Sequence, residues 1–275
     1  MNFKDLKITK QVKICLSLVI AIIMLLFIVI ILYSDKFYPN TTIGGIDVSN
    51  MTLSQAKEAV QTDLKNHVLV IKGRNNAKYE LRGTDIDLNA NYEKQVENCF
   101  KKTHGIFSFY KIISGEDFDV NFDVSYNKKA FKNNLSQSFL ITGDQYTITA
   151  PESAHVEYDK KTQSGKIVKE KQGNQLNQEK FYSYVEKSIK QLKTNIDLDK
   201  ANIYLKPKYT QNDSAIIKEL NQYNNYLYRW IRYDMTEKHY ETVTPKDIKN
   251  WLVINDDATV SIDQEKMSQW VEKFC

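Results

Sequence analysis

Glycine and proline are scarce in this sequence, with nine glycines and four prolines among 275 residues. A chain so poor in both is neither collagen-like nor a flexible linker, and most of its length is expected in regular structure. Hydrophobic residues make up 42%, charged residues 26% and aromatic residues 12%, which are ordinary globular values. We therefore expect one or two folded domains.

Cysteine is also rare, and the three positions Cys15, Cys99 and Cys275 do not form a disulfide framework. Cys15 lies at the start of an apolar run, whereas the modified cysteine of a lipoprotein follows such a run. We predict that all three cysteines are unpaired.

Motifs for catalysis are missing as well. The sequence has four histidines. His104 is followed by Gly105 but not by a cysteine, and His155 with Glu157 forms half of a zinc-deaminase signature without the cysteine pair that completes the ligand set. We interpret both histidines as structural or exposed.

Two further patterns lack the residues that their chemistry requires. Asp85, Asp87 and Asn89 alternate as in a calcium loop, but the glycine and the bidentate glutamate of that loop are absent. The Gly44-Gly45 pair is not followed by the further glycine or the Lys-Ser/Thr of a phosphate loop. No catalytic, cofactor-binding or metal-binding residue is therefore predicted, no cofactor is expected, and the ligand-binding residues are unknown.

One long apolar run lies near the N-terminus. Residues 14–33 contain no charge, and as a helix they span about 30 Å, the thickness of the hydrocarbon core of a bilayer. A signal peptide has a shorter apolar region and a small-residue cleavage site, which the sequence after Tyr33 does not supply. We predict a transmembrane helix over 14–33 that is retained as a signal anchor, rather than a removed signal peptide or a buried core helix.

The charges before this run indicate its orientation. Lys4, Lys7, Lys10 and Lys13 precede the run. The positive-inside rule then predicts a cytoplasmic tail over 1–13, a single pass through the cell membrane, and an extracytoplasmic location for the rest of the chain.

The remaining charge argues against nucleic acid as a partner. The first 33 residues hold four lysines and one aspartate, so they contribute +3 of the formal net charge of +4 and leave only +1 for the outer region. A nucleic-acid-binding surface needs clustered basic residues. Here lysine and glutamate are interspersed, and we interpret lysine-rich runs such as 166–171 as solvated faces.

Beyond the apolar run, alternating patterns predict a mixed α+β fold. An extended segment over 38–49 leads to a helix whose start has a capping box at Thr52 and Gln55. Strands are expected over 67–71 and 78–81, joined by a tight turn. A recurring pattern of short strand, Asp or Asn, and amphipathic helix is expected over 87–102, 123–139, 175–192 and 261–274.

Two of these helices share a motif that indicates an internal duplication. The sequence NQEK at 177–180 returns as DQEK at 263–266, and each is followed by a Val-Glu-Lys step. We predict two related α+β units at about 119–190 and 203–275. Chance similarity between two ordinary helix caps is the alternative.

Aromatic residues crowd one region of the C-terminal part. The group consists of Tyr223, Tyr226, Tyr228, Trp230, Tyr233, Tyr240 and Trp251. Such rings can stack on sugar faces while their polar groups bond to hydroxyls. At strand and helix spacing they more often fill a core, and we favour that role while glycan contact stays open.

Several motifs, taken in order, resemble one known family. They are YP at 38–39, IGGIDVS at 43–49, LSQA at 53–56, VEYD at 156–159 and KEKQGNQLN at 169–177. Together they resemble the YoaR-like peptidoglycan-binding domain of VanW-like proteins and of L,D-transpeptidases. Similarity to a second such unit of the transpeptidases extends over 204–209, 231–234 and 248–252.

The resemblance implies a Gram-positive cell-wall protein with peptidoglycan as its partner. It also implies an entry segment over 34–75, a YoaR-like domain over 76–195 and a second, related unit over 196–275. In the transpeptidases a YkuD-type domain follows, with a Ser-His-Gly-Cys motif whose cysteine attacks the peptide stem. That motif is absent here, since neither His104 nor Cys275 has the neighbours it requires.

We therefore predict a membrane-anchored, extracytoplasmic protein that binds peptidoglycan and is not catalytic as it stands. Two alternatives stay open. The chain is the front part of an L,D-transpeptidase, in which case coding sequence for Ser-His-Gly-Cys lies downstream, or it is a surface scaffold that binds another protein.

Overall fold

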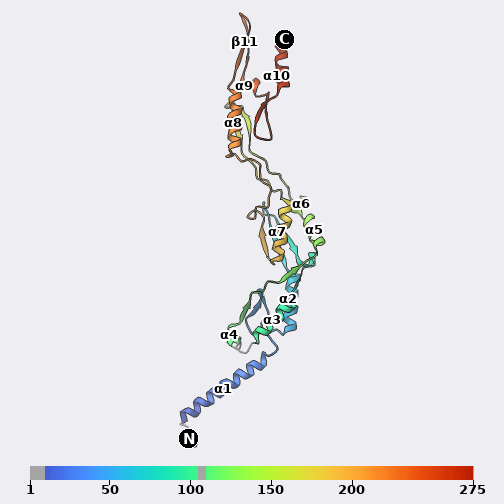
Figure 1. Ribbon diagram of the computed structural model, residues 1–275, viewed down its shortest axis with the longest axis vertical. Helices are drawn as coiled ribbons and strands as arrows, with labels where there is room; N and C mark the ends of the chain where they lie inside the picture. Colours follow the sequence, from blue (N-terminus) through green and yellow to red (C-terminus); the bar gives the residue numbers. More distant parts are fainter. Residues whose placement is uncertain (1–9, 105–109, 275) are drawn as a thin grey trace. The chain divides into compact units, whose positions relative to one another are not determined.

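The computed structural model describes residues 10–104 and 110–274 and shows a mixed α+β chain with several small sheets (Figure 1). The α+β class predicted from the sequence is confirmed. The chain forms two compact units, which we call unit 1 (Met1–Ser138 and Tyr182–Asp197) and unit 2 (Phe139–Phe181 and Leu198–Cys275). The chain therefore leaves unit 1, forms part of unit 2, and returns through one helix before it completes unit 2.

Helix α1 (Lys10–Leu32) is the apolar helix that the sequence predicts. Its segment Val12–Leu32 has a mean hydropathy of 3.5 and its most apolar window is not buried, so it is long and apolar enough to cross a membrane. A signal sequence passes the same test of length and composition. Lys4 and Lys7, on which the predicted orientation partly rests, lie outside the described residues.

The described part of unit 1 contains three small sheets and the helices that pack on them. Its helices after α1 are α2 (Leu53–Asn66), the 3-10 turn η2 (Gly83–Ile86), α3 (Glu93–Thr103), α4 (Lys111–Ser114), α5 (Lys128–Ser136) and most of α7 (Gln178–Lys190). Its strands are β1 (Thr41–Ile43), β2 (Ile46–Asp47), β3 (Val68–Lys72), β4 (Lys78–Arg82), β5 (Asn89–Asn91), β6 (Glu116–Phe118), β7 (Asp123–Ser125) and β10 (Asn195–Asp197).

Two of these sheets join segments that are distant in sequence. β10 is parallel to β3, which forms the predicted antiparallel hairpin with β4, and β6 is parallel to β1. The predicted boundary at 75/76 falls in the turn between β3 and β4, and the boundary at 195/196 falls within β10. The β10–β3–β4 sheet thus crosses both predicted boundaries. The boundaries stay a prediction about domains in the sequence, and they do not coincide with the limits of the compact units.

The core of unit 1 explains the positions of α2 and α3. Val60 and Leu64 of α2 are buried in one cluster with Val96 and Cys99 of α3 and with Phe37. Burying such apolar side chains stabilises the fold by roughly 1.5–3 kcal/mol each. Burial also raises the pKa of the Cys99 thiol, so Cys99 serves as a core residue rather than as a reactive one.

Helix starts follow the sequence signals at α2 but not at α3. The Thr52 hydroxyl accepts a hydrogen bond from the Gln55 N–H, and the Gln55 side chain accepts one from the Thr52 N–H, as the capping box predicts. The short strand and helix expected over 87–102 are present as β5 and α3, but the residue before α3 is Tyr92, whose side chain makes no capping bond, instead of the expected Asp or Asn. The preceding residues pair as β5 with β7, and this partner is too distant for a local pattern to reveal it.

The described part of unit 2 is built on three antiparallel strand pairs and helix α8. The strands are β8 (His155–Asp159), β9 (Ser164–Val168), β11 (Ile231–Thr236), β12 (His239–Val243), β13 (Leu252–Ile254) and β14 (Val260–Ile262). The helices are α6 (Phe139–Thr142), α8 (Ser214–Leu227), α9 (Pro245–Ile248), α10 (Gln264–Val271) and the 3-10 turn η4 (Glu272–Phe274). Helix α8 lies along the β8–β9 pair (Figure 1). Its residues Tyr223 and Leu227 are buried in a cluster with Val156, Val243 and Trp251.

Helices α7 and α10, which carry the repeated motif, begin in the same way. The Asn177 side chain accepts a hydrogen bond from the Lys180 N–H at 3.0 Å, and the Asp263 side chain accepts one from the Lys266 N–H at 3.1 Å. Their packing differs, because Phe181 of α7 is fully buried while the described residues of α10 include no buried side chain. A common origin of the segments 119–190 and 203–275 stays a prediction.

Candidate functional site

His104, the first histidine considered in the sequence, connects α3 to the end of α1. Its Nδ1 lies 2.8 Å from the carbonyl oxygen of Phe100, and its Nε2 lies 2.7 Å from that of Tyr33. Gly105 and Cys275 lie outside the described residues, and Cys15 is free and exposed. His104 therefore has a structural role at the point where the chain leaves the apolar helix.

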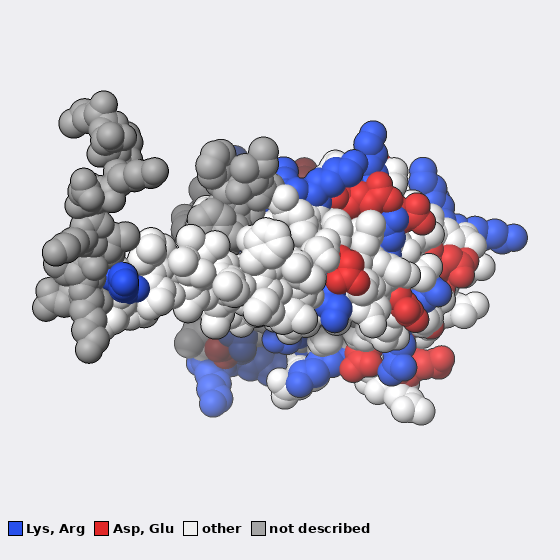
Figure 2. Space-filling model, turned by 90° about the horizontal axis from the view of Figure 1, so that it is seen from below, with Lys and Arg blue, Asp and Glu red and all other residues white. Residues whose placement is uncertain are grey.

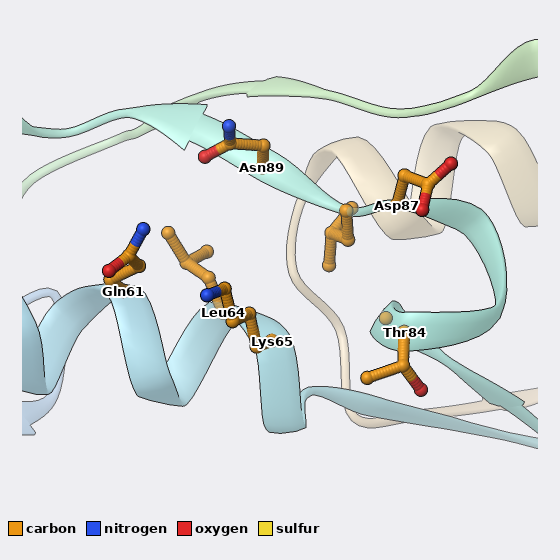
Figure 3. Close-up of a pocket in the computed structure, with 8 residues that line it drawn as sticks. Gln61, Leu64, Lys65, Thr84, Asp87 and Asn89 are labelled. Carbon is orange, nitrogen blue, oxygen red and sulfur yellow. The ribbon is translucent and has the colours of Figure 1, made fainter.

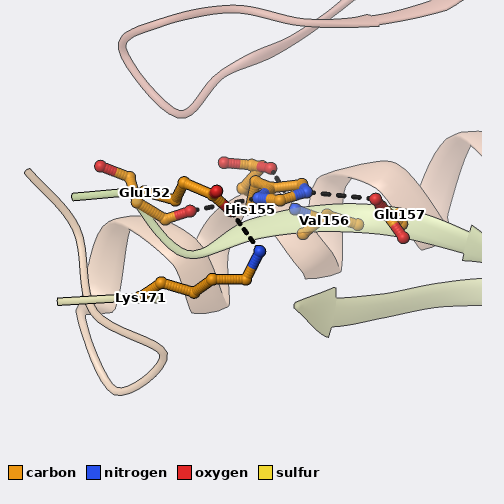
Figure 4. Close-up of polar contacts among 7 residues, drawn as sticks. Glu152, His155, Val156, Glu157 and Lys171 are labelled. Carbon is orange, nitrogen blue, oxygen red and sulfur yellow. Dashed lines mark hydrogen bonds and ion pairs between the residues drawn. The ribbon is translucent and has the colours of Figure 1, made fainter. Parts of the chain in front are cut away.

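His155 belongs to a polar cluster at the start of β8 (Figure 4). Its Nε2 lies 3.2 Å from the Glu157 carboxylate, and its Nδ1 lies 3.1 Å from the carbonyl oxygen of Ser153. Next to it, Lys171 and Glu152 form a 2.8 Å ion pair. Within 10–104 and 110–274, no three His, Cys, Asp or Glu side chains gather to hold a metal ion. The His155–Glu157 contact is thus a surface pair beside the Lys171–Glu152 ion pair.

Glu219 is the buried acid next to this cluster, and the sequence did not single it out. Its side chain comes from α8, is 1% exposed, and accepts a 3.0 Å hydrogen bond from the Val156 N–H of β8. Burial raises the pKa of the Glu219 carboxyl above its ordinary value, although this hydrogen bond and the nearby His155 act in the opposite direction. Glu219 therefore joins α8 to β8 at a cost that depends on pH.

We expect Glu219→Gln to be more stable than the wild type at pH 8, with a difference that shrinks towards pH 4. A carboxyl with a raised folded-state pKa binds more protons folded than unfolded, so the free energy of unfolding falls as pH rises above the unfolded value of about 4.3. Glutamine keeps the oxygen that accepts from Val156 and does not ionise. Urea unfolding followed by tryptophan fluorescence reports unit 2, because Trp230, Trp251 and Trp270 all lie there.

The control for this prediction is Glu152→Gln, which removes an exposed carboxylate that pairs with Lys171 in the same cluster. In this variant we expect the free energy of unfolding to change with pH between pH 4 and pH 8 as it does in the wild type. If the free energy of unfolding of the wild type and of Glu219→Gln changed with pH in the same way, the raised pKa of Glu219 would be contradicted.

Unit 1 contains a separate surface pocket of about 330 Å³ (Figure 3). Helix α2 contributes Gln61 and Lys65, η2 contributes Thr84, and the segment that leads into β5 contributes Asp87 and Asn89. These side chains are exposed, and they offer amide, ammonium, hydroxyl and carboxylate groups. The pocket is thus suited to a ligand that carries many hydroxyl and amide groups.

Backbone geometry brings the two walls of this pocket together. A Cβ on Gly83 would lie 2.7 Å from the carbonyl oxygen of Leu64 at the end of α2, and the Gly83 N–H donates to the carbonyl oxygen of His67 at 2.7 Å. Asp87 has a φ of 50° and turns the chain into β5. Only a residue without a side chain lets η2 approach α2 this closely.

The three oxygen-bearing residues that resemble a calcium loop each have a separate hydrogen-bond partner. A side-chain oxygen of Asp85 accepts from the Arg82 N–H, one of Asp87 accepts from the Asn127 amide at 3.0 Å, and that of Asn89 accepts from its neighbour Ala90. The contacts of Asp85 and Asn89 are local, whereas that of Asp87 joins two distant segments of unit 1.

The aromatic residues highlighted in the sequence divide into core and surface. Tyr223 and Trp251 are buried in unit 2, as the core interpretation predicts, and Tyr226 is half-buried. The others are largely exposed: Tyr228, Trp230, Tyr233 and Tyr240. Exposed aromatic rings around β11 and β12 therefore remain available for a ligand.

Charged side chains of both signs are interspersed on the face shown in Figure 2. The surface of α1 on that face is almost free of charge, as its composition requires.

A comparison with known families assigns part of the chain. Residues 79–197 match the family model described as "Putative peptidoglycan binding domain". No curated protein and no solved structure matches the chain. The match confirms the peptidoglycan-binding part of the resemblance noted in the sequence.

The matched region includes part of each polar site described above. It contains Thr84, Asp87 and Asn89 of the unit 1 pocket, and it contains the His155 cluster, whereas Gln61 and Lys65 precede it. The sequence assigned no ligand-binding residue, because Gln61 and Lys65 lie on the polar side of an ordinary amphipathic helix. Only the fold places them opposite Thr84 and Asn89 (Figure 3).

Proposed function

We propose that this protein is anchored in the cell membrane by α1 and binds peptidoglycan through its extracytoplasmic region, without catalysing a reaction itself. The observation that carries the proposal is the family match over 79–197. The uncharged segment 14–33, with four lysines before it and the matched region after it, supports a single pass with the N-terminus in the cytoplasm.

The unit 1 pocket is the contact surface that we propose for the polymer. Peptidoglycan consists of N-acetylated sugars and short peptides, which present hydroxyl, amide and carboxylate groups. Gln61, Thr84 and Asn89 can exchange hydrogen bonds with the first two kinds of group, and Lys65 can pair with a carboxylate. An open, polar pocket binds weakly, but a membrane tether holds it at a local concentration in the millimolar range, so weak contacts suffice.

Co-sedimentation with purified sacculi tests the proposal. Full-length protein in detergent is expected to sediment with sacculi in a saturable manner and to remain in the supernatant without them. Because the pocket includes charged groups, binding is expected to weaken as salt rises. Failure to co-sediment at any salt concentration would contradict peptidoglycan binding.

A pair of lysine variants tests the proposed contact surface. Lys65→Ala is expected to weaken sacculus binding about 1.4- to fivefold, since exposed charge contacts contribute roughly 0.2–1 kcal/mol. Lys94→Ala removes another exposed lysine, from α3 of the same unit, and is expected to bind as the wild type does. Equal binding by both variants would show that the polymer contacts another surface.

A further inference from the structure

Unit 2 contains a pocket of a different character from that of unit 1. It has a volume of about 310 Å³ and lies among the end of α8, the β11–β12 pair and α10. Its walls are mostly aromatic and aliphatic, and they include Tyr226, Tyr233, Trp251, Met267 and Trp270. The whole pocket lies outside the matched region 79–197. Its volume is at the lower end of the roughly 300–1,000 Å³ typical of small-ligand pockets, so it suits a short ligand rather than a polymer strand.

Two tryptophans form a rigid part of this pocket. The rings of Trp251 and Trp270 meet edge to face, with centroids 5.5 Å apart and an angle of 71° between their planes. Trp270 Nε1 donates a 3.2 Å hydrogen bond to Asp247. Burial disfavours the charged form of Asp247, but hydrogen bonds from Thr244 and Trp270 outweigh it and hold the pKa of this carboxyl below its ordinary value. A charged acceptor thus fixes the Trp270 ring before any ligand arrives.

Among the described residues that line the pocket, Arg229 is the only cationic one. Nowhere in the described chain does a carboxylate form an ion pair with its guanidinium. Arg232, three residues later, does have an acidic partner, because its Nε lies 2.8 Å from the Asp234 carboxylate. Its guanidinium carbon also lies 3.9 Å from the centroid of the Tyr240 ring. The pocket therefore combines apolar walls with one cation that lacks an anion, and a guanidinium matches a carboxylate in a bidentate geometry.

We propose that this pocket binds the carboxylate end of a peptidoglycan stem peptide. The carboxylate pairs with Arg229, and the methyl groups of alanine residues pack on Trp251, Trp270 and Met267. A sugar ring fits less well, because the apolar walls would leave several of its hydroxyls without partners. Tyr233 is 52% exposed, so a ligand would bury apolar surface that now faces water. This inference rests on the proposed function and adds to it a second, chemically distinct site.

Titration with N-acetyl-D-alanyl-D-alanine tests the inference, with the tryptophan fluorescence of full-length protein in detergent as the readout. We expect a saturable change, and about tenfold or greater weakening when the C-terminal carboxylate of the dipeptide is replaced by an amide. This comparison needs no variant. An N-acetylglucosamine oligomer is expected to give no response, and a response to it equal to that of the dipeptide would overturn the inference.

Two variants locate the response in this pocket. Arg229→Gln is expected to weaken dipeptide binding about tenfold or more, whereas Arg232→Gln, which alters a paired arginine outside the lining, is expected to bind as the wild type does. Trp230→Phe removes a fluorophore that does not line the pocket and should leave the signal in place. Equal weakening by Arg229→Gln and Arg232→Gln would overturn the assignment to Arg229.

Sacculus binding separates this inference from the proposed function. If the wild type sediments with sacculi but the dipeptide gives no response, the inference is wrong and the proposed function stands. If the dipeptide binds but the wild type does not sediment, the pocket is supported and the proposed function fails. Concentration-dependent dimerisation that blocks the dipeptide would identify a second copy of the chain as the occupant and overturn the inference.

Discussion

Replacing Gly83 with alanine is expected to lower the free energy of unfolding by about 1–3 kcal/mol. The added Cβ would lie 2.7 Å from the carbonyl oxygen of Leu64 and 3.1 Å from that of Lys65. Both are backbone atoms of α2, so they cannot rotate away as a flexible side chain would, and η2 or α2 must shift. Thermal unfolding of the full-length protein, followed by circular dichroism, measures the loss.

The same substitution is expected to weaken sacculus binding, because α2 and η2 form the two walls of the unit 1 pocket. Thr84→Ala is the control for stability. It lies next to Gly83 and is exposed, so we expect it to change the free energy of unfolding by no more than about 0.5 kcal/mol. A Gly83→Ala variant as stable as the wild type would show that η2 and α2 have room for a side chain.

Removal of residues 1–33 is expected to transfer the protein from the membrane pellet to the soluble fraction. The segment Val12–Leu32 has a mean hydropathy of 3.5 and is not buried by other parts of the described chain, so a bilayer is the environment that we propose for it. A single substitution tests the same point. One aspartate at the centre of the helix, as in Ile22→Asp, costs roughly 2.5–3.5 kcal/mol of insertion free energy and is expected to reduce the membrane-bound fraction. Membrane fractionation after carbonate washing is the measurement.

The orientation of the anchor can be tested on the same cells. Trypsin added to cells stripped of their wall is expected to digest the outer region, while Lys4 and Lys7 of the N-terminal tail become accessible only after lysis. Recovery of wild-type protein whose first residue lies near position 34 would identify the helix as a cleaved signal sequence and contradict the anchor.

Much of the local structure follows from the sequence. The uncharged run over 14–33 predicts an apolar helix, Thr52 with Gln55 predicts the start of α2, and the patterns over 67–71 and 78–81 predict the β3–β4 pair. All of these are confirmed. Each depends on residues that are close together in the chain, which is why a window of sequence contains the necessary information.

The start of α3 shows where such prediction stops, because Tyr92 precedes the helix in place of the expected Asp or Asn cap. Asn89–Asn91 has the polar composition of a helix cap, but it forms a strand because β7, more than 30 residues away by the numbering of the two strands, supplies its hydrogen-bond partners. A pairing of this kind depends on tertiary structure, which overrides local preference. The candidate sites are subject to the same limit, since Lys65 and Thr84 share a pocket only because Gly83 lets two elements meet.

By itself, the sequence determined the apolar N-terminal helix, the α+β class, the absence of a Ser-His-Gly-Cys motif within these 275 residues and the resemblance that the family match over 79–197 supports. These features depend on composition, short-range periodicity and motif order. The tertiary structure alone decided that Glu219 is buried under β8, that Gln61 and Asn89 line one pocket, and that Arg229 lacks a carboxylate partner in the described chain. The physical reason is that burial, pocket shape and ion pairing depend on contacts between residues far apart in the chain.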